Sequence, residues 1–262
     1  MASMQTIGII AAISQETEAL LRHIGQWKRF PFGPFRTYRF RLLERDCLLI
    51  ESGMGFKRSA NAARALMIVA NPRFVISFGV AGAVEDDLQI GDVVLSRAAC
   101  ILDQGIPAQF HRLASFSDAA WQAAAQALDL RGARLYSGTA ITTSGSQIVL
   151  RQVATIEHPI LEMETAGIAQ VLEEKGIPLL SVRAISDCPR EPIPFDLNGT
   201  TDEEGSLRLG RLILMVMRQP KILFQSRRLL RNVRRAAANA AIALTAALQQ
   251  PVVLASENHT NP

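Results

Sequence analysis

The sequence predicts one α/β domain with a central mixed, twisted β-sheet flanked by helices, followed by a basic helical extension. Short apolar runs bounded by turn residues alternate with helical patterns, and a C-terminal segment carries only basic charge. With 262 residues, 48% of them hydrophobic, the chain can bury one large core. We expect the α/β domain in residues 1–204, the extension with a closing helix in 205–250, and a disordered tail in 251–262.

Six apolar runs are expected as central strands, because they are short, rich in Val and Ile, and often continuous rather than alternating. They are residues 6–13, 47–55, 74–82, 91–99, 136–143 and 178–186. Helical patterns lie between them at 15–25, 57–70, 117–128 and 162–175. Strands that alternate with helices indicate a parallel or mixed sheet.

The C-terminal part begins after a loop at 188–204, which is rich in Pro, Asp, Asn and Gly. We expect one helix over 206–218 and a second that starts at Pro220. Three- and four-residue steps give the second helix an apolar face. This face holds Ile222, Ser226, Leu229, Val233, Ala237, Ala240, Leu244 and Leu248. Another face holds Lys221, Arg228, Arg231 and Arg235.

The formal net charge of +4 is unevenly distributed along the chain. Residues 205–256 contain nine basic side chains and no acid, whereas residues 1–204 are mildly acidic. An arginine-rich stretch without interleaved aromatic residues is weak evidence for nucleic-acid binding. We therefore predict no nucleic-acid partner.

The cysteines and the N-terminus bear on the compartment. Cys47, Cys100 and Cys188 show neither a metal-binding spacing nor an even disulfide set. No apolar run reaches the roughly 18 residues that span a bilayer, and no signal peptide is evident. We expect a reduced, cytoplasmic protein without a bound metal.

Polar residues and glycines at the ends of predicted strands mark the candidate ligand sites, because open α/β sheets bind ligands there. Glu16 follows the first strand, where it either caps a helix or faces a ligand. Two glycine turns follow later strands, with Gly53 and Gly55 in one and Gly79 and Gly82 in the other. They are either ordinary turns or places where a ligand approaches the backbone. Neither matches a phosphate-binding fingerprint.

The segment "LEMETAGIAQVLEEKGIPLLSVRAISD" places three acids within apolar runs, where charge is costly. Desolvation is expected to raise the pKa of Asp187, and a neutral Asp can protonate a leaving group. Glu162 and Glu164 are two residues apart, so we expect them to point in different directions, with at most one facing the same site as Asp187. The alternative is a structural role on the surface or in a pair with Arg183.

Together, "IGIIAAISQETEALL", "SGMGFKRSANAA", "FGVAGAVEDDLQIGDVVLS", "LEMETAGIAQV" and "IPLLSVRAISD" span residues 7 to 187. In this order they resemble the nucleoside phosphorylase and nucleosidase superfamily, in particular its methylthioadenosine/S-adenosylhomocysteine nucleosidase branch. The resemblance implies the fold of that superfamily and cleavage of a ribosyl–adenine bond. It also implies a homo-oligomer, commonly a dimer, and no cofactor.

The resemblance implies a role for each acid. Asp187 matches the acid that protonates purine N7, and Ser186 matches the residue that orients it. Glu164 matches the ligand of the ribose hydroxyls, with Met163 as the apolar contact beneath the sugar. Glu16 matches the carboxylate that activates the attacking water.

Further residues complete the predicted site. Ala81, Gly82 and Glu162 are expected at the substrate. Lys57 and Arg58 are candidates for binding phosphate, if the enzyme is a purine nucleoside phosphorylase instead of a hydrolase. An acid beside the nucleophile would repel phosphate and help to deprotonate water, which favours water.

The basic extension is similar to that of hopanoid-associated phosphorylase-type proteins, taken to be adenosylhopane nucleosidases. Their substrate is an adenine nucleoside with a lipid on its 5′ carbon, and basic helices in 205–235 could contact the inner membrane face. The alternative is that the extension packs on the body or on an oligomer partner. A non-catalytic nucleoside-binding or membrane-interface protein is the alternative of another class.

Overall fold

The computed structural model describes residues 6–256 except 104, 144–152, 154 and 190–219. Its strands are β1 (Thr6–Ala11), β2 (Trp27–Arg29), β3 (Arg36–Leu42), β4 (Arg45–Glu51), β5 (Phe74–Ala83), β6 (Val93–Asp103), β7 (Ile106–Arg112), β8 (Leu135–Thr142), β9 (Pro159–Glu162) and β10 (Leu179–Asp187). Its helices are α1 (Ser14–His23), α2 (Phe56–Ala70), α3 (Asp118–Asp129), α4 (Thr165–Glu173) and α6 (Pro220–Leu248). The predicted α/β class is confirmed.

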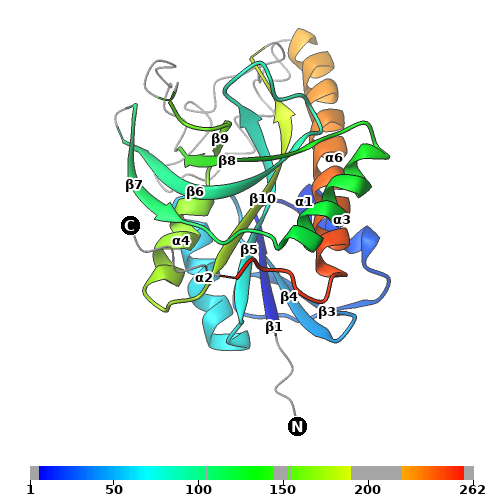
Figure 1. Ribbon diagram of the computed structural model, residues 1–262, viewed down its shortest axis with the longest axis vertical. Helices are drawn as coiled ribbons and strands as arrows, with labels where there is room; N and C mark the ends of the chain where they lie inside the picture. Colours follow the sequence, from blue (N-terminus) through cyan, green and yellow to red (C-terminus); the bar gives the residue numbers. More distant parts are fainter. Residues whose placement is uncertain (1–5, 104, 144–152, 154, 190–219, 257–262) are drawn as a thin grey trace.

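The strands form one mixed sheet in the order β10-β6-β8-β9-β5-β1-β4-β3-β2, with β7 paired to β6. Strand β10 also pairs in parallel with β5, so β5, β9, β8, β6 and β10 close into a ring. Strands β1, β5 and β10 run in parallel side by side. Their carboxyl ends therefore meet at one edge of the sheet (Figure 1).

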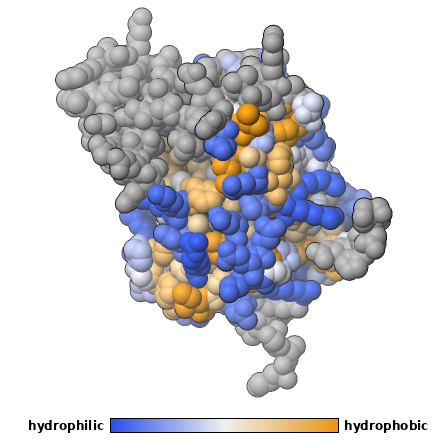
Figure 2. Space-filling model, turned by 90° about the vertical axis from the view of Figure 1, so that its left-hand side faces the viewer, coloured by the Kyte–Doolittle hydropathy of each residue, from blue (hydrophilic) through white to orange (hydrophobic). Residues whose placement is uncertain are grey.

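Helices cover both faces of the sheet (Figure 1). Helices α1, α3 and α6 pack together on one side, and α2 packs with α4 on the other. Each pair of layers has its own apolar core, one containing Leu20, Phe78 and Leu244 and the other containing Leu66 and Ile168. The side that carries α2, α4 and β7 is largely hydrophilic, with separate apolar patches (Figure 2).

All six predicted strands are present, as β1, β4, β5, β6, β8 and β10. One predicted helix needs correction, because 159–162 forms β9 and α4 begins only at Thr165. The predicted helix over 206–218 lies outside the described residues. Residues 251–256, expected in a disordered tail, instead pair with 115–117, and Ser117 N–H donates to Val253 O at 2.7 Å.

Helix α6 has two halves of different character. From Ala236 to Leu248 most side chains are buried against the sheet, and this half closes the core. From Arg227 to Arg235 the arginines are exposed. The predicted apolar face is confirmed for the described side chains, because its members from Leu229 onward are at least half-buried, namely Leu229, Val233, Ala237, Ala240, Leu244 and Leu248. No helix in the described part of the chain is long and apolar enough to cross a membrane.

Candidate active site

A buried arginine lies at the centre of the site. Arg183 is 1% exposed and lies in the middle of β10, where its two neighbours, Val182 and Ala184, are apolar. Its guanidinium forms ion pairs with Glu162 (Nη2 to Oε2, 3.0 Å) and Glu164 (Nη1 to Oε2, 3.3 Å). It also donates from Nη2 to Ser77 Oγ at 2.7 Å. A buried cation requires such partners, so β10 can carry Arg183 only because these acids face it.

Glu162 is a structural acid. Its Oε2 accepts the N–H groups of Glu164 (2.9 Å) and Thr165 (2.7 Å), and Oε1 accepts the hydroxyl of Thr142. These bonds fix the turn from β9 into α4 and satisfy both oxygens, besides the ion pair with Arg183. Substrate binding by Glu162 stays a prediction beside these structural contacts. The expectation that Glu162 and Glu164 diverge is wrong, because the strand ends between them and both reach the same guanidinium.

Glu164 is the first residue of the turn into α4 and is 5% exposed. Its Oε1 accepts the N–H of Gly55 at 3.0 Å, which ties the glycine turn after β4 to the site. Burial raises the pKa of Glu164 to about 7, with Arg183 lowering it and the neighbouring Glu162 and Glu16 raising it further. A carboxylate with this pKa is balanced between its charged and neutral forms near pH 7.

Glu16 caps the start of α1 and also links it to β5. Its Oε2 accepts the N–H groups of Ala12 (2.8 Å) and Ile13 (3.1 Å), as a cap does, and its Oε1 crosses to the N–H of Val80 in β5 (2.9 Å). The side chain is therefore inside the molecule, 2% exposed. Burial raises its pKa, while Arg183 and the three N–H groups oppose the shift.

Gly79 creates the space for this arrangement. A Cβ atom there would stand 2.2 Å from Glu16 Oε1 and 2.7 Å from Arg183 Nη1. Three buried carboxylates, those of Glu16, Glu162 and Glu164, thus surround one guanidinium. The cluster holds three carboxylates and one cation. Burial is the main reason why the pKa values of Glu16 and Glu164 rise despite the arginine, and for Glu164 the neighbouring Glu162 and Glu16 add to the rise.

Asp187 stands apart from this cluster, at the carboxyl end of β10. Its register partner is Gly82 of β5, where a Cβ would lie 2.6 Å from Asp187 Oδ2. The hydroxyl of Ser186 donates to Asp187 Oδ1 at 2.7 Å. Burial raises the pKa of Asp187, and the bond from Ser186 lowers it.

The remaining predicted residues differ in their placement. Ala81 O lies 3.3 Å from Ser186 Oγ, so Ala81 supports the residue next to Asp187. Met163 is half-buried between the two glutamates. Arg58 folds back over the turn after β4, because a Cβ on Gly53 would meet its Nη1 at 2.9 Å. Lys57 is exposed, and no contact with the acids is seen in the described region.

The sequence indicated the acids but missed their centre. Arg183 was considered only as a possible partner, although a cation inside the apolar run of β10 is itself a signal for a buried ionic cluster. Among the described residues, no group of His, Cys, Asp and Glu is arranged to hold a metal ion.

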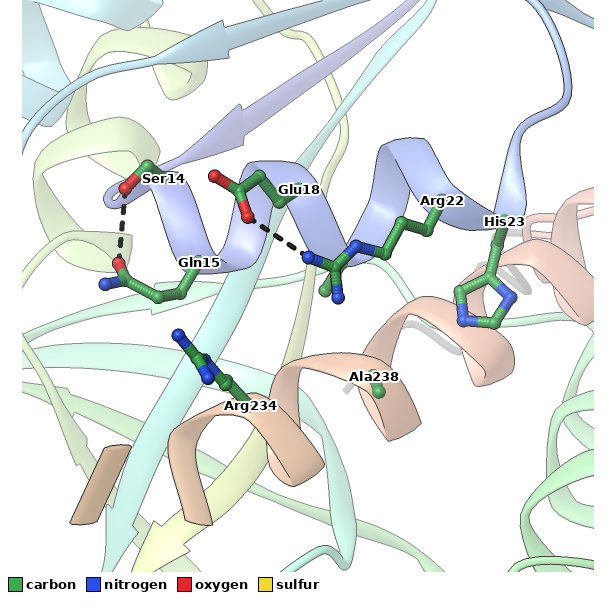
Figure 3. Close-up of a pocket in the computed structure, with 8 residues that line it drawn as sticks. Ser14, Gln15, Glu18, Arg22, His23, Arg234 and Ala238 are labelled. Carbon is green, nitrogen blue, oxygen red and sulfur yellow. Dashed lines mark hydrogen bonds and ion pairs between the residues drawn. The ribbon is translucent and has the colours of Figure 1, made fainter. Parts of the chain in front are cut away.

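A cavity of about 140 Å³ lies elsewhere, between α1 and α6 (Figure 3). Its walls include Gln15, Glu18, Arg22 and Arg234, and Glu18 is paired with Arg22. It contains none of the acids around Arg183, so we do not assign it to the reaction.

Solved structures share the fold of this chain. A methylthioadenosine/S-adenosylhomocysteine nucleosidase of Colwellia psychrerythraea, solved with adenine, matches 97% of the chain and 99% of its own length, with a TM-score of 0.69 at 18% identity. Futalosine hydrolase of Helicobacter pylori matches 93% of the chain and 97% of its own, with a TM-score of 0.66 at 18% identity.

Sequence comparison supplies the family. A methylthioadenosine/S-adenosylhomocysteine nucleosidase of Glaesserella parasuis is 30% identical over 197 residues, which cover 69% of this chain and 85% of that protein. The model of the phosphorylase superfamily matches residues 6–218. The chain belongs to the phosphorylase superfamily and is an enzyme of the nucleoside phosphorylase and nucleosidase kind.

Proposed function

We propose that this enzyme hydrolyses the bond between ribose and adenine in a 5′-substituted adenine nucleoside and releases adenine. The observation that carries the proposal is that the buried acids contact β5 at two separate places. The Glu16–Arg183–Glu164 cluster faces Gly79, and Asp187 faces Gly82. Three residues of strand separate the α-carbons of Gly79 and Gly82 by roughly 10 Å, which is the scale of a nucleoside.

The chemistry divides between the two places. As the C1′–N9 bond breaks, its electron pair goes to the base, and a neutral Asp187 donates a proton to purine N7. Water attacks C1′ and loses a proton to Glu16. Glu164 accepts hydrogen bonds from the ribose hydroxyls, and its charge favours the oxocarbenium-like transition state. One acid for the leaving group and one base for water, separated by the sugar, is the arrangement of a hydrolysing glycosidase.

Water fits this cluster better than phosphate, which is the nucleophile in the alternative activity, purine nucleoside phosphorylase. Three carboxylates around one guanidinium repel an anion. One observation favours the alternative: Arg58 lies over the glycine turn whose Gly55 binds Glu164, so one cation is close to the cluster.

Adenine release from methylthioadenosine, measured with and without phosphate, tests the proposal. We expect phosphate-independent release that falls at least about 100-fold in Asp187→Asn, since positioned acids contribute factors of that size. Asp129→Asn changes an exposed acid at the end of α3 and should leave the rate unchanged. Release that requires phosphate would make the enzyme a phosphorylase. No release from any adenine nucleoside would favour a non-catalytic binding protein.

The 5′ substituent is the finer part of the proposal. A small thioether is supported by the names of the relatives, whereas a lipid such as a hopanoid is supported by the exposed basic half of α6. We propose a cytoplasmic enzyme in peripheral contact with the inner membrane face, since exposed arginines are attracted to anionic lipids. Lipid-linked adenosine is the substrate to compare with methylthioadenosine.

We further propose a homodimer. The side of α2 and β7 exposes apolar side chains, namely Ile68, Ile106 and Phe110, which are 80%, 54% and 58% exposed. A contact with a second copy would cover these side chains. A monomeric mass by light scattering at micromolar concentration would refute the proposal.

A further inference from the structure

We infer that Asn239 of α6 is a positioning residue for Asp187, an inference that rests on the proposed role of Asp187 as the acid. Asn239 is 1% exposed and lies on the buried side of α6, among alanines. A polar amide at such a position is costly unless it is bonded. Its Nδ2 donates to Gly91 O at 2.8 Å, and its Oδ1 accepts from Arg131 Nε at 3.4 Å.

Gly91, which accepts the hydrogen bond from Asn239, is itself bonded to β10. Gly91 N–H donates to Ile185 O at 2.8 Å, and Ile185 N–H donates to Asp92 O at 2.8 Å. Residues 91 and 92 therefore hold Ile185 from both its N–H and its C=O, two residues before Asp187. Asp92 is itself fixed, because its carboxylate accepts the N–H groups of Gln89 and Arg134, each at 2.9 Å.

This support acts where β10 departs from regular pairing. The register between β10 and β5 shifts between Ile185 and Asp187, so the β5 side alone does not define the backbone at Ser186. The Gly91–Asp92 pair supplies the opposite side. Gly91 has φ +101°, and a Cβ there would lie 3.0 Å from Asn239 Nδ2, so the turn and the amide are closely matched.

Two substrates distinguish positioning of the acid from general stabilisation. Methylthioadenosine needs a proton on its leaving group, whereas 4-nitrophenyl 5-methylthioribofuranoside releases 4-nitrophenoxide, an anion that needs none. Asn239→Asp keeps the shape and the acceptor for Arg131 but removes the donor to Gly91. We expect kcat for adenine release to fall about tenfold or more with little change in KM, and nitrophenoxide release to change less than about twofold.

Asn239→Ser, which leaves room for a bridging water, should lose less of the adenine rate than Asn239→Asp and serves if the latter does not fold. Thr245→Val is the matched control, because Thr245 is on the same helix and, in the described contacts, its hydroxyl bonds only Ala241 O, at 2.7 Å. Equal loss on both substrates, or no loss on either, would overturn the inference. If the wild type cleaves neither substrate, the proposed function has failed instead.

Discussion

Single glycines decide whether the site can form. At Gly79 and at Gly82, a carboxylate that we propose to act in the reaction fills the space that a Cβ atom would take. The carboxylate is that of Glu16 at Gly79 and that of Asp187 at Gly82. Each glycine therefore leaves space for a neighbouring acid, and close approach of a ligand to the backbone there stays a prediction. From the sequence, the two glycines could be recognised as unusual, but the atoms that fill their space come from other elements.

Gly79→Ala should inactivate the enzyme without unfolding it. The new methyl group would displace Glu16 Oε1 and Arg183 Nη1, and misplaced groups of this kind cost about 100-fold in rate. Overpacking should also cost about 1–3 kcal/mol in the free energy of unfolding. Steady-state kinetics and denaturant unfolding measure the two effects.

Gly25→Ala is the matched control, because a Cβ added at Gly25 would meet no other atom within 4 Å. It should retain the wild-type rate. An active Gly79→Ala enzyme would show that Glu16 and Arg183 need not stay where they are for the reaction.

At the scale of elements, strands made of continuous apolar runs could be predicted, whereas exposed, alternating or very short strands could not. The six predicted strands are continuous apolar runs, whereas β2 is exposed along its length and β7 is mostly exposed or half-buried. Strand β9 has only four residues and leads directly into α4, so its apolar residues look like the start of that helix. In the site, Glu16, Glu164 and Asp187 were predicted together, but the contact of Glu162 with Arg183 depends on this strand.

Because the arginines of α6 are exposed in one half and the buried residues lie in the other, we predict that membrane binding can be weakened without loss of catalysis. Replacing Arg227, Arg231 and Arg234 by Gln should weaken binding to vesicles rich in phosphatidylglycerol by roughly 100-fold, at about 1 kcal/mol for each charge. Hydrolysis of methylthioadenosine should persist, because these side chains are exposed and outside the acid cluster. Vesicle cosedimentation measures the binding.

Arg29, Arg64 and Arg73 are also exposed and provide a control with the same change in charge. Equal weakening in both triple variants would mean that net charge, not α6, attracts the vesicles. Binding to phosphatidylcholine vesicles of the same size would argue against an electrostatic contact, and tight binding to duplex DNA would indicate a nucleic-acid partner.

At the scale of the whole molecule, closure of the sheet makes the charged cluster possible. Strand β10 pairs with both β5 and β6, so Arg183 has neighbouring strands on each side and is withdrawn from water together with three acids. No local pattern in the sequence predicts this closure, because it joins strands about 100 residues apart. Burying these charges lowers the free energy of unfolding of the whole domain.

That cost predicts how stability depends on pH. The folded-state pKa of Glu164 is raised from 4.5 to about 7, so the folded chain binds this proton more tightly than the unfolded chain does. The contribution is present in full below about pH 4.5 and is lost as the pH rises through about 7. The contribution of Glu164 to the free energy of unfolding amounts to about 3 kcal/mol at most.

Glu164→Gln cannot ionise, so its free energy of unfolding should fall less between about pH 5 and about pH 8 than that of the wild type. Denaturant unfolding at both pH values, with Glu174→Gln as an exposed control at the C-terminal end of the same helix, measures the difference. An unchanged slope in Glu164→Gln would mean that Arg183 keeps Glu164 ionised throughout, and that the excess charge of the cluster is neutralised elsewhere.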